Sequence, residues 1–179
     1  MMVSIIDCNF WNGNKAKAPE RFDCGNSEIN CFLKEKIVSD KRKNQERLIL
    51  VADDESIYGF ISVSLGEVRT SFFKKENHIV LVVNAIGIDK SHQNNGYGTQ
   101  LLMIAYQLAL TVNQVIPIGG LYLVALVDAF DFYIKFDLIN LNAPPEFVPG
   151  QQEFQMVISI DQIESLGLSP FSNPIDLSS

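Results

Sequence analysis

The sequence predicts an α/β (α+β) protein in which helices flank one mixed central β-sheet. Three observations support this fold class. Apolar residues recur at helical spacing in two segments of the chain. Short runs rich in Val, Ile and Leu lie around these segments, as strands do. One such run, HIVLVVNAIGID from His78 to Asp89, is rich in Ile and Val and mostly apolar, which is typical of a strand covered on both faces.

Length and composition limit the kind of protein this is. The 179 residues fit one domain, and a hydrophobic fraction of 47% excludes a disordered chain. With 14 Lys and Arg against 21 Asp and Glu, the net charge is −7. This acidity argues against a protein that holds nucleic acid by bulk charge, although it leaves a local basic patch open.

Cysteine usage and hydrophobicity bear on cofactors and location. The three cysteines and two histidines fit no common zinc spacing, so we expect reduced thiols and no metal. The N-terminus lacks the pattern of a signal peptide, and the longest mostly apolar stretch is well short of the roughly 20 residues that span a bilayer. We therefore expect a soluble, cytoplasmic protein without a membrane partner.

The first half of the chain predicts a helix and a hairpin. After an apolar opening and a polar loop, Ile29, Phe32, Leu33 and Ile37 form one helical face, which either Asn26 or Ser27 could cap. The runs LILVA and IYGFISVSL follow, joined by the turn DDES, which indicates two strands of a hairpin.

The second half alternates helices and strands. From Gly98 the apolar residues lie on one side of a helix: Leu101, Leu102, Ala105, Leu108, Ala109 and Val112. Next come a strand (GGLYLVALV), a short helix (DAFDFYIKF), a Pro-rich loop (NAPPEFVPG) and a closing strand (FQMVISI). We expect the tail after Leu166 to be frayed.

The segment from Ile86 to Thr99 is the best candidate for a binding site. A buried strand ends, a polar loop with Gly96 and Gly98 follows, and a helix begins. The first N–H groups of a helix have no partner within it and carry partial positive charge, so this turn can hold a pyrophosphate. Glycine lets the backbone approach an anion without a Cβ in the way. The alternative is an ordinary strand-to-helix loop whose glycines serve only the turn.

Two motifs in this order resemble the GNAT N-acetyltransferases. The run Gln93-Asn94-Asn95-Gly96-Tyr97-Gly98 is similar to the acetyl-CoA loop [QR]-x-x-G-x-[GA] of that superfamily. Downstream, Ala129 to Tyr133 retain A-x-x-F-Y, with Asp137 and Leu138 in place of the usual Gly-Phe. The resemblance implies the GNAT acyl-CoA N-acyltransferase fold over residues 1–179, with 1–20 and 167–179 peripheral or frayed. It also implies acetyl-CoA as the co-substrate.

The resemblance further assigns roles to individual residues. The backbone of Ile86 and Ile88 would pair with the pantetheine arm, and Tyr133 would donate a proton to the leaving thiolate. A tyrosine that only packs in the core is the alternative for Tyr133. Some relatives carry a glutamate on the central strand, but Val82 to Ala85 offer no carboxylate, and Glu67 is more readily a solvated surface residue. The pyrophosphate would rest on N–H groups of Gln93, Asn94, Asn95, Gly96, Tyr97, Gly98 and Thr99.

The segment FDCGNSEINCFL, from Phe22, is similar to the start of the GNAT toxins of toxin–antitoxin pairs, which acetylate aminoacyl-tRNA. That branch commonly has basic residues where this chain has Asn94 and Asn95. We therefore expect an N-acetyltransferase acting on a primary amine of a small molecule or protein. A tRNA acceptor is less favoured, and a non-catalytic acyl-CoA-binding module, a homodimer and an antitoxin partner remain open. The cations available to RNA are Lys34, Lys36, Lys41, Arg42, Lys43 and Arg47.

Overall fold

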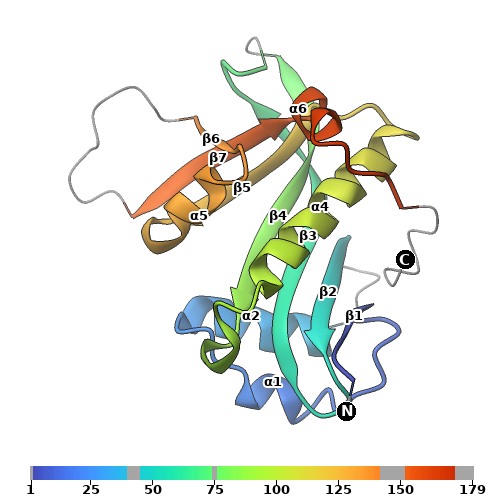
Figure 1. Ribbon diagram of the computed structural model, residues 1–179, viewed down its shortest axis with the longest axis vertical. Coiled ribbons are helices and arrows are strands. Elements are labelled where there is room, and N and C mark those ends of the chain that lie inside the picture. Colours follow the sequence, from blue (N-terminus) through green and yellow to red (C-terminus); the bar gives the residue numbers. More distant parts are fainter. Residues whose placement is uncertain (1, 40–44, 74–75, 142–151, 172–179) are drawn as a thin grey trace. The chain divides into compact units, whose positions relative to one another are not determined.

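The computed structural model describes residues 2–39, 45–73, 76–141 and 152–171 (Figure 1). Its strands are β1 (Ser4–Asp7), β2 (Glu46–Ala52), β3 (Ile57–Arg69), β4 (Asn77–Ile88), β5 (Gly120–Leu126), β6 (Ile139–Asn140) and β7 (Glu153–Ser159). Its helices are α1 (Ala18–Arg21), α2 (Ser27–Val38), α4 (Tyr97–Asn113), α5 (Phe130–Ile134) and α6 (Ile160–Ser165), with 3₁₀ turns η1 (Lys90–His92) and η2 (Val127–Ala129). The predicted hairpin, central strand, long helix and short helix are all present.

The strands form the mixed sheet that the sequence predicts. Their order is β1-β2-β3-β4-β5-β7-β6. β1 pairs antiparallel with β2, and β2 with β3, whereas β4 and β5 are parallel. β7 lies antiparallel to both β5 and β6. The parallel pair is what makes a helical crossover between these two strands necessary, and α4 supplies it.

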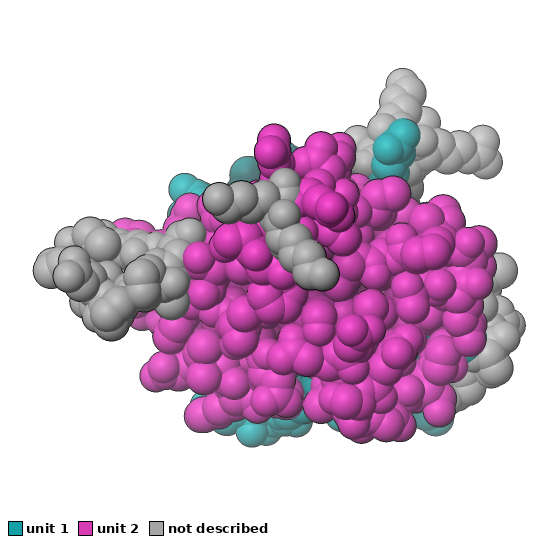
Figure 2. Space-filling view, turned by 90° about the horizontal axis from the view of Figure 1, so that it is seen from above, with its two compact units in different colours: residues 1–64, 84–105, 171–179 teal, residues 65–83, 106–170 magenta. Residues whose placement is uncertain are grey.

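The described residues belong to two compact units, coloured separately in Figure 2. The first unit comprises residues 1–64, 84–105 and 171–179, and the second comprises residues 65–83 and 106–170. β3, β4 and α4 each contribute residues to both units.

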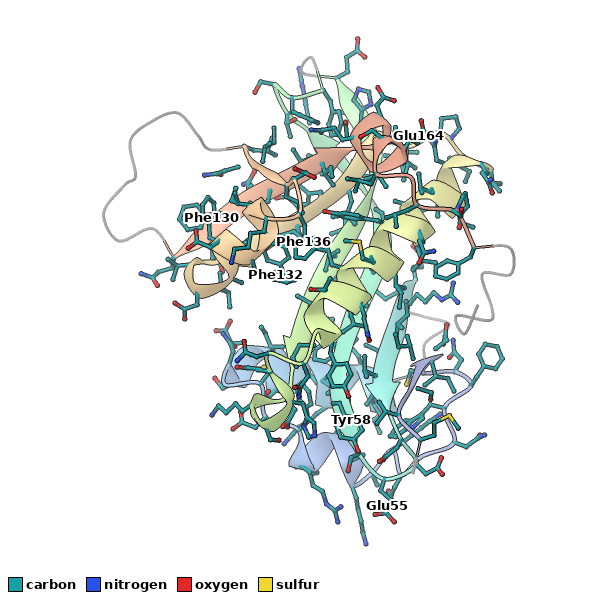
Figure 3. The ribbon with its side chains drawn as sticks, viewed as in Figure 1. Glu55, Tyr58, Phe130, Phe132, Phe136 and Glu164 are labelled. Carbon is teal, nitrogen blue, oxygen red and sulfur yellow. The ribbon has the colours of Figure 1, made fainter. Side chains whose placement is uncertain are left out.

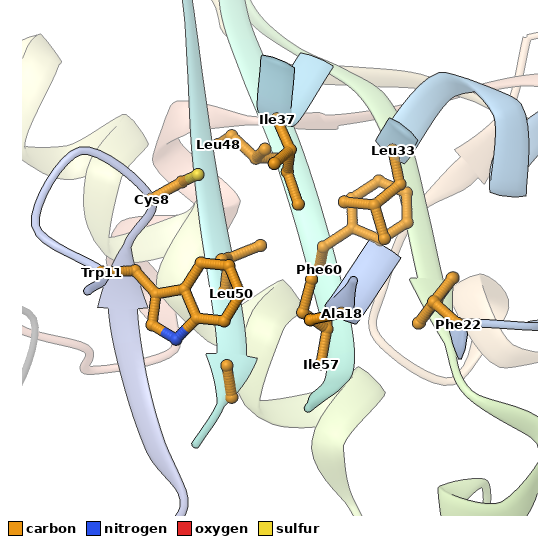
Figure 4. Close-up of a cluster of buried hydrophobic side chains, with 11 residues drawn as sticks. Cys8, Trp11, Ala18, Phe22, Leu33, Ile37, Leu48, Leu50, Ile57 and Phe60 are labelled. Atoms are coloured by element: carbon orange, nitrogen blue, oxygen red, sulfur yellow. The ribbon is translucent and has the colours of Figure 1, made fainter. Parts of the chain in front are cut away.

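The core of the first unit lies between α2 and one face of β2 and β3 (Figure 4). Asn26 is the cap of α2, since its Oδ1 accepts hydrogen bonds from the N–H groups of Glu28 and Ile29. The ring of Phe60 contacts those of Phe22 and Phe32, at centroid distances of 5.6 and 6.2 Å. These contacts hold α2 on the sheet, as its apolar face predicts.

The N-terminal residues contribute to this core, although we expected residues 1–20 to be peripheral. Cys8, Trp11 and Ala18 are all buried, and the Trp11 indole donates a hydrogen bond to the Asp53 carbonyl. β1 adds a strand beside β2. The short apolar opening was too brief to predict this strand.

The core of the second unit surrounds β5 and β7. Phe73, Val80 and Val157 form a buried cluster on one face. The closing strand was predicted over the run FQMVISI, and it is confirmed: β7 ends at Ser159, and α6, which was not predicted, follows. Ser159 and Gln162 form a capping box, in which each side chain bonds the other's backbone N–H, so α6 begins directly after the strand.

Among the described residues, no helix is both long and apolar enough to cross a membrane. The cytoplasmic location therefore stays a prediction. The Pro-rich loop and the last eight residues of the tail lie outside the described residues, as do Lys41, Arg42 and Lys43.

Candidate active site

The predicted strand–loop–helix turn lies entirely within the first unit. β4 ends at Ile88, η1 covers Lys90–His92, and α4 begins at Tyr97. Gly96 has a φ of +82°, a left-handed backbone that favours glycine, and a Cβ built on it would meet nothing within 4 Å. Asn94 is also left-handed, with a φ of 62°, which asparagine tolerates. The turn therefore exposes open space at the N-terminus of a 17-residue helix, where an anion can approach N–H groups.

The side chain of Gln93 holds the loop from within. Its Nε2 donates hydrogen bonds to the carbonyls of Cys24 and Ile88, both at 3.2 Å. This explains why an amide-bearing residue suits the first position of the motif. The side chain of Gln93 is thus committed to the protein, and its predicted contribution to a pyrophosphate falls to its backbone N–H.

A second segment of the chain is fastened to this loop through Asp23. The Asp23 N–H donates to Asp89 Oδ2 at 3.1 Å, and the Lys90 N–H donates to the Asp23 carbonyl at 2.8 Å. Lys90 Nζ and Asp23 Oδ2 form an ion pair at 3.0 Å, and Asn30 Nδ2 donates to Asp23 Oδ1 at 2.9 Å. We call Asp23, Asn30, Asp89, Lys90 and Gln93 the loop clamp.

The electrostatics of the loop clamp agree with its geometry. The Asn30 amide, the Lys90 ammonium and the Gly25 N–H lower the pKa of Asp23 to about 2. Burial opposes the charge of Asp89, but hydrogen bonds from Ser91 and from the Asp23 N–H lower its pKa on balance. Both carboxylates therefore remain ionised at neutral pH and anchor N–H groups around the loop.

Sequence reasoning missed the loop clamp. The only signal in the sequence was that the segment from Phe22 to Leu33 is similar to the toxin branch. The structure gives that segment a physical role. Gly25 has a φ of +94°, and a Cβ there would lie 3.0 Å from Lys90 Cε. The glycine therefore fits both the turn and the close approach of the lysine.

His92, in η1, packs against a tyrosine of β3. It is half-buried, its Nδ1 lies 3.1 Å from Ser91 Oγ, and its ring contacts that of Tyr58 at a centroid distance of 4.4 Å. The Tyr58 hydroxyl in turn donates to Asp53 Oδ2 at 2.6 Å. Tyr58 and Glu55 are labelled near the β2–β3 turn in Figure 3.

Tyr133 belongs to the second unit, on α5. Only 4% of its surface is exposed, and burial raises the pKa of its hydroxyl. Among the described residues its hydroxyl has no hydrogen-bond partner.

Tyr106, in the same unit, is the contrasting case. It is fully buried and its hydroxyl donates to the Phe136 carbonyl at 2.7 Å, so it is structural. This bond helps to fix the end of α5, where Asp137 has a left-handed φ of 64°. Asp137 thus takes the backbone conformation that the glycine of the family motif would take. Around α5 lie the labelled rings of Phe130, Phe132 and Phe136 (Figure 3).

The basic cluster is largely neutralised where it is described. Lys34 pairs with Glu20 at 2.8 Å, Lys36 with Glu46 at 3.0 Å, and Arg47 with Asp7 at 2.8 Å. Within the described ranges no group of three or more His, Cys, Asp or Glu residues is placed to hold a metal ion. The three cysteines are free.

Comparison with known proteins identifies the class. A family model described as the acetyltransferase (GNAT) family matches residues 11–117, more than half of the chain. The chain therefore belongs to the GNAT acetyltransferase family, as its motifs predicted.

Solved structures share the fold over nearly the whole chain. A mutant of the toxin AtaT, bound to the C-terminus of the antitoxin AtaR and acetyl-CoA, has a TM-score of 0.74 at 20% identity, covering 93% of this chain and 99% of that one. The structure of AtaT complexed with acetyl-methionyl-tRNAfMet has a TM-score of 0.73 at 21% identity, and the match covers 93% of this chain and 100% of that one. The structure of the KacTA–DNA complex has a TM-score of 0.69 at 21% identity, and the match covers 93% of this chain and 98% of that one. At these identities the similarity is one of fold.

Proposed function

We propose that this protein transfers the acetyl group of acetyl-CoA directly to a primary amine. The observation that carries the proposal is the open, left-handed Gly96 at the N-terminus of α4 in a chain of the GNAT family. The diphosphate of the co-substrate would rest on the N–H groups of residues 93–99, and the helix dipole would favour its charge. The backbone of Ile86 and Ile88 would hold the pantetheine arm.

Tyr133 is proposed as the general acid. As the amine nitrogen bonds to the acetyl carbon, the carbon–sulfur bond breaks and the CoA thiolate needs a proton. Burial raises the pKa of Tyr133, so the phenol stays protonated at neutral pH and is available to donate. Tyr133 stands at the position that the family's A-x-x-F-Y motif gives to this proton donor.

The acceptor has two candidates. A primary amine on a small molecule or protein is what the acidic composition favours. Aminoacyl-tRNA is the second candidate, because a structure of AtaT with acetyl-methionyl-tRNAfMet shares the fold over 93% of this chain. An antitoxin partner belongs to this second candidate, since AtaT is also solved with the antitoxin AtaR.

The test of the chemistry compares two tyrosines. Tyr133→Phe keeps the ring but removes the proton donor, so kcat should fall by about 10²–10⁴-fold while acetyl-CoA affinity is unchanged. Tyr106→Phe is the matched control, because it removes a buried hydroxyl from the same unit and leaves the Phe136 carbonyl without its donor. It should cost about 1–3 kcal/mol of stability but leave kcat of the folded protein intact.

The acceptor is decided by incubating labelled acetyl-CoA with amino acids, polyamines, peptides and charged tRNA, each at low and high salt. Label on a small amine or peptide supports the first candidate, and label on the aminoacyl group alone supports the second. Tight binding of acetyl-CoA without transfer to any acceptor would refute the enzyme and leave a binding module. An unchanged kcat in Tyr133→Phe would mean that water protonates the thiolate.

A further inference from the structure

Asn84 is a polar residue in the middle of an apolar strand, and its side chain is held in a fixed orientation. In the first unit its Nδ2 donates to Ser62 Oγ at 3.4 Å, and its Oδ1 accepts from Ser64 Oγ at 3.1 Å. Ser62 is almost fully buried and itself donates to Glu46 Oε2 at 3.4 Å. The row of polar groups thus runs from buried Ser62 to exposed Asn84. The Asn84 amide uses one of its two N–H donors and one of its two acceptor lone pairs in this row, so one of each is left for a further hydrogen bond.

The strand is irregular at this residue. Ala85 packs against the cluster that contains Phe60, whereas Asn84 bonds to Ser62. Phe60 and Ser62 are two residues apart on β3 and therefore share a face of the sheet. Two consecutive residues of β4 thus reach the same face, which breaks the strand alternation in the manner of a β-bulge. Bulges are over-represented next to active sites, where they re-aim a side chain.

The length of the co-substrate gives this residue a function. The pantetheine arm has about thirteen bonds from phosphorus to sulfur, the length of roughly four extended residues, or about 15 Å. An arm that begins at the loop beyond Ile88 and runs back along β4 ends four residues earlier, beside Asn84. The arm's path rests on the proposed function.

We propose that Asn84 positions the acceptor amine for attack on the thioester. Its Oδ1, fixed by Ser64, accepts a hydrogen bond from the amine and directs the nitrogen lone pair at the acetyl carbon. Because the amide is neutral and is not a base, it orients the amine without taking its proton. The amine therefore arrives uncharged, and its proton leaves through water.

The kinetic test separates the two substrates. Asn84→Ala should raise the KM for the amine about tenfold, the worth of one good hydrogen bond, while the KM for acetyl-CoA stays unchanged. Asn113→Ala is the matched control: Asn113 also makes two side-chain hydrogen bonds, to Glu164 and the Ile118 N–H, on α4 in the second unit. Equal effects of the two variants on the amine KM would overturn the proposal. The pH dependence of kcat/KM in the wild type should follow the pKa of the amine used.

A second readout needs no turnover. The side-chain amide signal of Asn84 in a ¹⁵N spectrum, identified by its loss in Asn84→Ala, should move on addition of acetyl-CoA. It should stay in place with 3′-phospho-ADP, which has the diphosphate but no pantetheine arm. A signal that moves with neither ligand, or equally with both, overturns the placement of Asn84 beside the thioester. If acetyl-CoA binds but no amine is acetylated, the proposed function fails, and this signal alone decides where the arm lies.

Discussion

Replacement of Gly96 by alanine tests the binding loop most directly. The residue has a φ of +82°, and left-handed backbone costs a non-glycine residue about 1–2 kcal/mol. For a chain of this size that lowers Tm by about 2–8 °C. Apart from Gly96 itself and its two chain neighbours, no described residue comes within 4 Å of the added Cβ, so strain in φ accounts for the expected stability loss.

Gly96→Ala should also weaken the binding of acetyl-CoA, beyond its effect on the stability of the fold. The new methyl group stands in the open space beside the first N–H groups of α4. Loss of one hydrogen bond from such an N–H to a charged phosphate is worth about 1.5–3 kcal/mol, which weakens acetyl-CoA binding roughly 10- to 150-fold. Isothermal titration calorimetry on the folded variant measures this directly.

Gly167 provides a control with the same strain. It follows α6, has a φ of +72°, and a Cβ there also meets nothing within 4 Å. Gly167→Ala should lower Tm by a similar amount and leave the dissociation constant for acetyl-CoA unchanged. If both variants lose stability equally and both bind acetyl-CoA like the wild type, the loop does not carry the diphosphate.

Two further predictions concern the first unit. Asp23→Asn removes the ion pair of the loop clamp and should weaken acetyl-CoA binding several-fold. The charge swap Asp23→Lys with Lys90→Asp should restore part of the lost affinity. Equal dissociation constants for the wild type and both variants would show that the loop clamp has no influence on the binding loop. Tyr58→Phe should change how the free energy of unfolding depends on alkaline pH. The hydrogen bond to Asp53 raises the pKa of Tyr58 to about 12, above the unfolded value of about 10. The stabilisation from this hydrogen bond is therefore present below pH 10 and is lost between about pH 10 and 12. Urea unfolding at pH 8 and pH 11.5 should therefore show a smaller pH-dependent loss in the variant, and an identical loss would contradict the assignment.

Local patterns predicted the elements that local physics determines. The apolar spacing from Ile29 to Ile37 marked α2, because a helix that buries one face needs that period. The turn DDES separated two strands at the observed place. The polar loop before α4 was recognisable because glycine at 96 serves a left-handed turn that few other residues tolerate.

What the sequence could not reveal depends on contacts between distant residues. The hydrogen bond from the Asp23 N–H to Asp89 joins residues 66 positions apart, and no periodicity records it. β1 is four residues long and forms because β2 offers it a partner edge. Helix α6 was not predicted, because Ile160 and Ile163 fit a strand pattern as well as they fit a helix, until the cap at Ser159 decides between them.

The ion pairs of the first unit bear on the choice of acceptor. A cation binds a phosphate most strongly when it has no competing carboxylate, and three cations of the basic cluster each have one within 3.0 Å. The partner of Arg47 is the buried Asp7, which would be left without its cation if the arginine turned to a phosphate. Affinity for RNA grows with the number of phosphates that cations neutralise, so these three described cations provide less of it than their charges alone suggest. These ion pairs therefore support the first proposed acceptor, an amine on a small molecule or protein, over aminoacyl-tRNA.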